Sequence, residues 1–102
     1  MEVYTKTYET VNGLVEGVQT KWAGFSVLIV TGTKGFLACP AIDVEASERY
    51  GVAAALVEST PDNPIRTLER FPDRKITKVN TKAAELGIKP GMAVADAFML
   101  IA

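Results

Sequence analysis

Cys39 and Asp43 are the residues of this chain best placed to do covalent chemistry. Cys39 ends a predicted strand over 36–39, and Asp43 precedes a predicted helix over 44–50. Free amides at a helix start stabilise a thiolate, which would make Cys39 a nucleophile with Asp43 as acid–base partner. The alternative is structural, because free cysteines are usually buried and aspartate is a common helix cap. Both readings remain open, and two ligands make no metal site.

A second candidate is the basic stretch that follows Pro64. Asn63-Pro64 is a typical helix start, so we expect a helix over 64–71. Arg66 and Arg70 would then share one helical face, where they could bind a small anionic ligand. An ordinary solvated surface is the alternative, since Glu69 lies between them. Few aromatic side chains accompany the cluster, which disfavours nucleic acid.

The chain contains no histidine and one cysteine, so several reaction classes are excluded. Catalytic triads that depend on histidine, zinc sites built from histidine or from several cysteines, and paired-cysteine redox centres all require residues that are missing. No motif for a cofactor is present, and none is expected. The sequence therefore leans against an enzyme, without settling the question.

The hydrophobic pattern predicts a sheet with interspersed helices. Residues 14–22 are ambiguous between strand and helix, and we favour a strand because Gly13 and Gly17 weaken a helix. The predicted strands are 2–11, 14–22, 25–31, 36–39, 52–58 and 75–79, and the predicted helices are 44–50, 64–71, 81–87 and 93–101. This order indicates an α+β, two-layer sandwich: a mostly antiparallel or mixed sheet with helices packed on one face.

Length and composition indicate one domain spanning residues 1–102. The net charge is −1, from 11 basic and 12 acidic residues, so no global attraction to nucleic acid or membranes is expected. The sequence shows neither a signal peptide nor an apolar run long enough to span a bilayer. A lone cysteine fits a reducing, cytoplasmic setting.

Two segments resemble a known family. Residues 35–43, Gly-Phe-Leu-Ala-Cys-Pro-Ala-Ile-Asp, and residues 83–92, Ala-Ala-Glu-Leu-Gly-Ile-Lys-Pro-Gly-Met, are similar to the YunC-like family of small archaeal and bacterial domains. Pro40 departs from the glycine expected in many relatives. The resemblance implies an α+β fold and supplies no activity, because none is assigned to that family.

Two classes of function follow. The first is a non-enzymatic module that forms a homodimer or binds another protein, and the apolar segment 97–101 is either its last core element or its dimer surface. The second is a binder of a small molecule, an anion among the options, or a thiol-dependent enzyme; it is centred on Cys39 and Asp43, with Arg66 as a further candidate. We favour the first.

Overall fold

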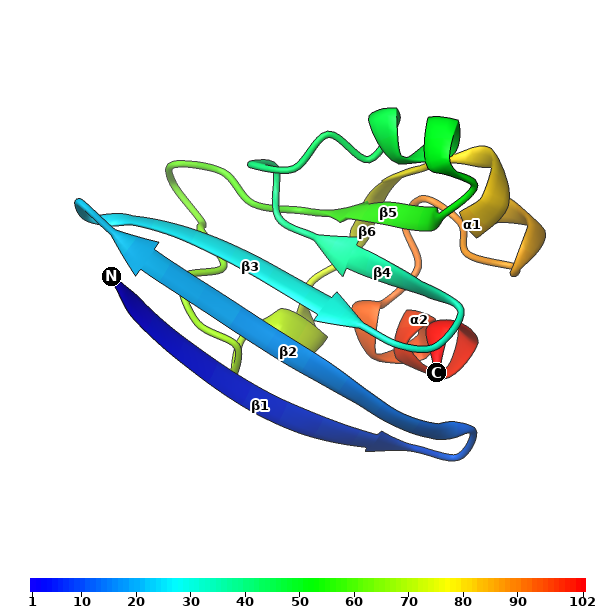
Figure 1. Cartoon of the computed structure of the whole chain (residues 1–102), viewed down its shortest axis with the longest axis horizontal. Coiled ribbons are helices and arrows are strands. Elements are labelled where there is room, and N and C mark those ends of the chain that lie inside the picture. The colour runs from blue at the N-terminus through cyan, green and yellow to red at the C-terminus, as the bar shows by residue number, and fades with distance from the viewer.

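The computed structural model describes all residues 1–102 and contains one six-stranded sheet in the order β1-β2-β3-β4-β5-β6 (Figure 1). The strands are β1 (Glu2–Thr10), β2 (Gly13–Trp22), β3 (Phe25–Thr31), β4 (Gly35–Ala38), β5 (Ala53–Val57) and β6 (Ile76–Val79). All neighbours are antiparallel except β4 and β5, which are parallel.

The ambiguous residues 14–22 form β2, which pairs along its length with β1 and over residues 16–22 with β3. Side chains alternate between the two faces of the sheet. Val15 and Gln19 are buried on the inner face, whereas Leu14 and Trp22 point outward and are exposed. Pairing on both sides satisfies the backbone of β2, and the period of two matches the burial pattern. The strand interpretation is therefore confirmed.

The parallel pair β4–β5 requires a crossover, and residues 39–52 supply it. The helix expected over 44–50 is a shorter 3-10 helix, η1 (Ala46–Tyr50). Asp43 precedes it, and its Oδ1 accepts hydrogen bonds from the N–H groups of Glu45 and Ala46 at 3.0 and 3.3 Å. Val44 packs with Ala38 and Ala54 on the outer face of the sheet. The crossover thus covers that face over β4 and β5.

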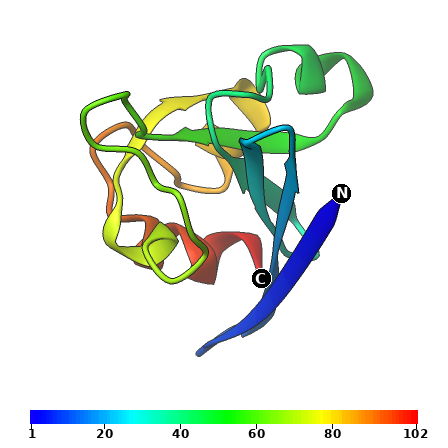
Figure 2. The ribbon, with the colours of Figure 1, turned by 90° about the vertical axis from the view of Figure 1, so that its left-hand side faces the viewer.

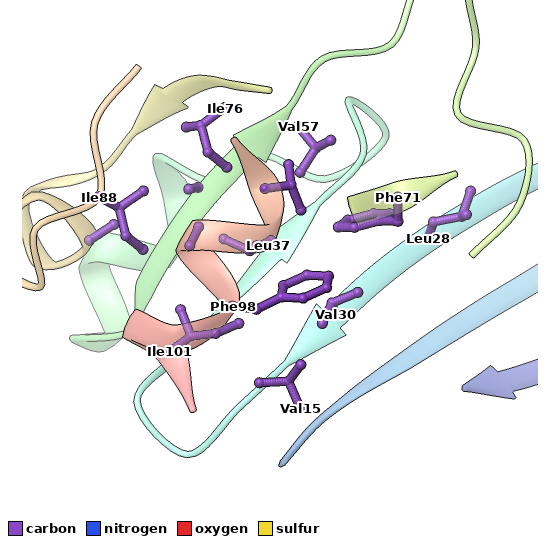
Figure 3. Packing of buried hydrophobic residues seen from close by; sticks show 14 of the residues in the cluster. Val15, Leu28, Val30, Leu37, Val57, Phe71, Ile76, Ile88, Phe98 and Ile101 are labelled. Atoms are coloured by element: carbon purple, nitrogen blue, oxygen red, sulfur yellow. The ribbon is translucent and has the colours of Figure 1, made fainter. Parts of the chain in front are cut away.

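Both α-helices pack on the opposite, inner face. These are α1 (Thr81–Glu85) and α2 (Val94–Ile101), and α2 contributes Ala97, Phe98 and Ile101 to the main core. Figure 3 shows Phe98 near Phe71 and Val30, and the two aromatic rings are stacked at 6.3 Å. The C-terminal apolar segment is therefore a core element, which answers one alternative posed by the sequence. None of the helices has the length and apolar character that a membrane-spanning helix needs.

The helix expected over 64–71 is wrong. The segment is an irregular loop with a turn over 68–70, followed by the 3-10 helix η2 (Phe71–Asp73), so Arg66 and Arg70 do not share a helical face. Arg66 has a φ of 63°, a left-handed conformation that an α-helix cannot contain. The prediction failed because Asn63 closes a turn with Thr60, and distant side chains hold the residues that follow.

The fold class expected from the sequence is confirmed as an α+β fold with a mixed sheet. The inner face of the sheet, α1, α2 and the loop over 58–70 enclose the main core (Figures 1 and 2). That loop faces β1, β2 and β3 near the ends of the strands, and the candidate site lies between them.

Candidate functional site

A groove of about 1250 Å³ lies between the inner face of the sheet and the loop over 59–69. We call it the groove. One wall comes from β1, β2 and β3, with Lys6, Lys21 and Ser26, and the other from the loop, with Arg66 and Thr67. Figure 2 shows this loop as the light-green segment on the far side from the blue N-terminal strands. The groove therefore joins segments that are about 40 to 60 residues apart in the sequence.

The charge around the groove is positive. Its lining includes Lys6, Lys21 and Arg66 against a single carboxylate, Glu69, which gives three positive charges minus one negative, or +2. The ion pairs of the protein are Arg74–Glu58 and Lys78–Glu45, so none of the three cations has a carboxylate within 4.0 Å. Positive charge in a concave site raises the local concentration of anions.

Arg66 is held in its unusual backbone conformation by a buried side chain. Gln19 is 8% exposed, and its Nε2 donates a hydrogen bond of 3.0 Å to the carbonyl of Arg66. Left-handed φ in a non-glycine residue costs about 1–2 kcal/mol and occurs often at functional sites. The conformation leaves the Arg66 side chain exposed at the groove instead of packed in the core.

The same loop is fixed to the sheet and to itself by two further side chains. The hydroxyl of Tyr8 donates to the carbonyl of Leu68, and burial, with a smaller contribution from Glu69, raises the pKa of Tyr8 to about 12. At the other end of the loop, the buried Arg74 donates from Nη2 to the carbonyl of Asn63 at 2.6 Å. The wall that carries Arg66 is consequently positioned by side chains from β1, β2 and the segment after η2.

Cys39 lines the floor of the groove but is only 5% exposed. The N–H of Leu28 donates to its Sγ at 3.4 Å, which ties the thiol to β3. Of the residues predicted from the sequence, Cys39 and Arg66 are thus brought to one groove. A thiol in this position contributes more to packing than to a reaction with solute molecules.

Asp43 and Arg70 do not line the groove. Asp43 uses its carboxylate to cap the start of η1, so the suggested pair of Cys39 and Asp43 does not converge on the groove. Arg70 is exposed at the end of the loop. No three histidine, cysteine, aspartate or glutamate side chains come close enough to hold a metal ion.

Sequence reasoning missed Lys6, Lys21 and Gln19. One signal was present: in β2 the polar Gln19 occupies the same strand face as Val15, where an apolar residue is expected. A polar residue in a core position must find a partner, and its partner here is the loop. No sequence pattern pointed to Lys6 or Lys21, because they become part of a site only when the loop lies opposite them.

Comparison with solved structures confirms the fold. A crystal structure of a protein of unknown function from Thermoplasma acidophilum superposes with a TM-score of 0.84 at 19% sequence identity, covering 99% of this chain and 94% of that one. No curated protein matches the sequence. The family model for the domain of unknown function DUF1805 matches residues 38–101, which is more than half of the chain and includes Cys39 and Arg66. The chain therefore belongs to the DUF1805 family.

Proposed function

We propose that the protein binds a small anionic molecule in the groove. The observation that carries the proposal is the presence of three cations, Lys6, Lys21 and Arg66, around one concavity without a carboxylate partner. Arginine is suited to planar carboxylate and phosphate groups because its guanidinium donates two parallel hydrogen bonds. Its strained backbone places that guanidinium at the groove.

The groove also has features that suit an organic body attached to the anionic group. Leu28, Ile65 and Leu68 supply apolar surface, and Ser26 and Ser59 supply hydroxyls. Small-molecule sites are commonly about 300–1000 Å³, with mainly apolar walls and a few placed polar groups. The groove is somewhat larger than this and open, so the expected ligand is a carboxylate or phosphate of metabolite size.

Binding is favoured over thiol chemistry by the burial of Cys39. A nucleophilic thiol must be reached by its substrate, whereas Cys39 is 5% exposed and its Sγ accepts a hydrogen bond from the N–H of Leu28. The alkylation rate of Cys39 in native and in unfolded protein tests this preference. Rapid native alkylation would favour a thiol-dependent enzyme instead.

The binding experiment is calorimetric titration with inorganic phosphate and with citrate at low salt, repeated at higher salt. Arg66→Gln should weaken binding about tenfold or more, since hydrogen bonds to charged groups contribute about 1.5–3 kcal/mol. Arg70→Gln is the matched control, because it removes the same charge from the same exposed loop without altering the groove. Binding should also weaken as salt rises.

Two results would contradict the proposal. The first is the absence of saturable binding of either anion at low salt. The second is an equal loss of affinity in Arg66→Gln and Arg70→Gln, which would indicate general charge attraction and not a site. Thermal unfolding of both variants without ligand shows whether either substitution has altered the fold.

We further propose that the chain is a single-domain, YunC-like member of its family that acts in the cytoplasm. The support is the similarity of residues 35–43 and 83–92 to that family, and a single cysteine that is free and buried. Expression of a tagged chain followed by cell fractionation tests the location. Recovery mainly in a membrane or extracellular fraction would contradict it.

A further inference from the structure

The outer edge of β1 is an open sheet edge. β1 spans Glu2–Thr10, pairs only with β2, and lies at the boundary of the sheet with no segment beyond it (Figure 1). Backbone hydrogen bonds outside the regular strands and helices involve no residue of β1. Half of the N–H and C=O groups of a regular edge strand point away from its neighbour. They form a template for another strand.

The opposite edge of the sheet, β6, is short and covered by another segment of the chain. β6 is a short strand of four residues, and the segment after α1 runs beside it. The N–H of Ile76 donates to the carbonyl of Met92, and the N–H of Gly91 donates to the carbonyl of Ile76. Short edges and covered edges are two of the protections against unwanted pairing. The long, uncovered β1 lacks both devices.

We propose that β1 pairs antiparallel with β1 of a second copy of this chain, around a two-fold axis at Thr5, to form a continuous sheet. An antiparallel strand pair is compatible with two-fold symmetry, because each strand presents the same groups to the other. In a continuous sheet the inner faces of both copies must lie on the same side. Each inner-face residue of one β1 must therefore lie opposite an inner-face residue of the other β1, which is the case when the axis passes through a residue. This restricts the axis near the centre of β1 to Thr5, Lys6 or Thr7.

Charge selects Thr5 among these. An axis at Lys6 would oppose two ammonium groups directly, and like charges in opposed positions are destabilising. An axis at Thr5 places Lys6 directly opposite Tyr4 of the second copy. The diagonal neighbours of Lys6 are then Glu2 and Lys6 of that copy. Each ammonium then has an aromatic ring and a carboxylate nearby. An axis at Thr7 also leaves the two Lys6 side chains on a diagonal, but Glu2 then lies outside the paired region and supplies no carboxylate to them.

The dimer would also bring the two grooves together. Tyr4, Thr5 and Lys6 line the groove as well as forming the edge. Pairing at Thr5 adds the Lys6 ammonium of the second copy beside that wall. The dimer proposal rests on the open edge of β1 and on the charges along it, and it holds whether or not the groove binds an anion.

The first experiment measures mass by sedimentation equilibrium over a wide concentration range. The unmodified chain should reach twice its monomer mass of 11.0 kDa. Thr5→Lys introduces a like-charge pair at the axis and should raise the dimer dissociation constant about fivefold. Val11→Lys is the control, since Val11 is exposed in the β1–β2 turn, beyond the paired region.

The second experiment tests the register. In Thr5→Cys the introduced thiols of the two copies face each other at the axis, so a short bis-maleimide should cross-link them efficiently. Val11→Cys should give little cross-link, and Cys39 is buried and should not compete. A monomer at every concentration would overturn the proposal, as would a dimer that tolerates Thr5→Lys and cross-links no better through Thr5→Cys than through Val11→Cys. Circular dichroism of each variant excludes unfolding as the cause.

Discussion

Asn80→Asp should lower the free energy of unfolding, and the loss should depend on pH. Asn80 is 3% exposed and makes four hydrogen bonds that join separate parts of the fold. Its Oδ1 accepts from the N–H groups of Ala54 and Ala83 at 3.1 and 2.9 Å. Its Nδ2 donates to the carbonyls of Val44 and Val52 at 3.3 and 2.8 Å. One amide thus ties the crossover and β5 to the start of α1.

An aspartate has nearly the same shape but, when ionised, no donor. It keeps the two accepted bonds and loses the two donated ones, a cost of about 1–3 kcal/mol. Its second oxygen would also face two carbonyl oxygens without a cation, and leaving a buried charge uncompensated costs about 3–5 kcal/mol. The expected loss at pH 7 is therefore about 4 kcal/mol or more, a large share of the roughly 5–15 kcal/mol typical of a domain.

Acidification should recover part of this loss. Burial beside carbonyl oxygens raises the pKa of the introduced carboxyl above its ordinary value of about 3.9. At a pH below the ordinary pKa of about 3.9, the carboxyl is protonated in both the folded and the unfolded state, and it can again donate one hydrogen bond. As pH rises above it, the unfolded state ionises first, so stability falls until the folded pKa is passed.

The assay is urea denaturation of the native chain, Asn80→Asp and Asn63→Asp between pH 4 and 8. Asn63 is exposed, so its variant should remain within about 0.5 kcal/mol of the native chain. The reasoning is refuted if Asn80→Asp unfolds at the same urea concentration as Asn63→Asp at pH 7. It is also refuted if the difference between the two variants does not shrink toward acid pH.

Two further predictions concern single contacts. Gly32→Ala should destabilise the fold by about 2 kcal/mol or more, because a Cβ at Gly32 would lie 2.1 Å from the carbonyl oxygen of Ile101 and one of the two backbones must move; thermal unfolding unchanged from the native chain would contradict this. Tyr8 has its pKa raised to about 12 by burial and by Glu69, so the neutral phenol stabilises the fold below pH 10 and that contribution is lost as pH rises from 10 to 12. Tyr8→Phe, which also lacks the hydrogen bond to Leu68, should show a smaller fall in urea midpoint over that range than the native chain; equal falls would count against the assignment.

Most of the strands could be predicted from the sequence because their signals are local. Apolar runs such as residues 25–31 and the alternation over 14–22 have the period of a sheet, and the observed strands match them within one or two residues. The helix expected over 64–71 shows where local signals fail. Asn63-Pro64 suits a turn as well as a helix start, and Gln19, Tyr8 and Arg74 decide in favour of the loop.

Only some residues of the candidate site could be predicted from the sequence. The sequence singled out Cys39 as the one thiol, and it singled out Arg66 by its spacing from Arg70 on a helix that does not form. Their meeting in one groove depends on strand order and on how the loop crosses the sheet. Lys6 and Lys21 could not be recognised beforehand, because an exposed lysine on a strand is ordinary until a second wall faces it.

The sequence by itself determined the α+β class, the positions of the strands along the chain and the absence of histidine and paired-cysteine chemistry, since these depend on short-range periodicity and on which functional groups exist. The tertiary structure alone decided which side chains converge. It kept Asp43 out of the groove, placed Arg66 at the groove and left β1 as an open edge. Convergence depends on contacts between residues far apart in the chain, and these form only when the whole sheet and its loops are assembled.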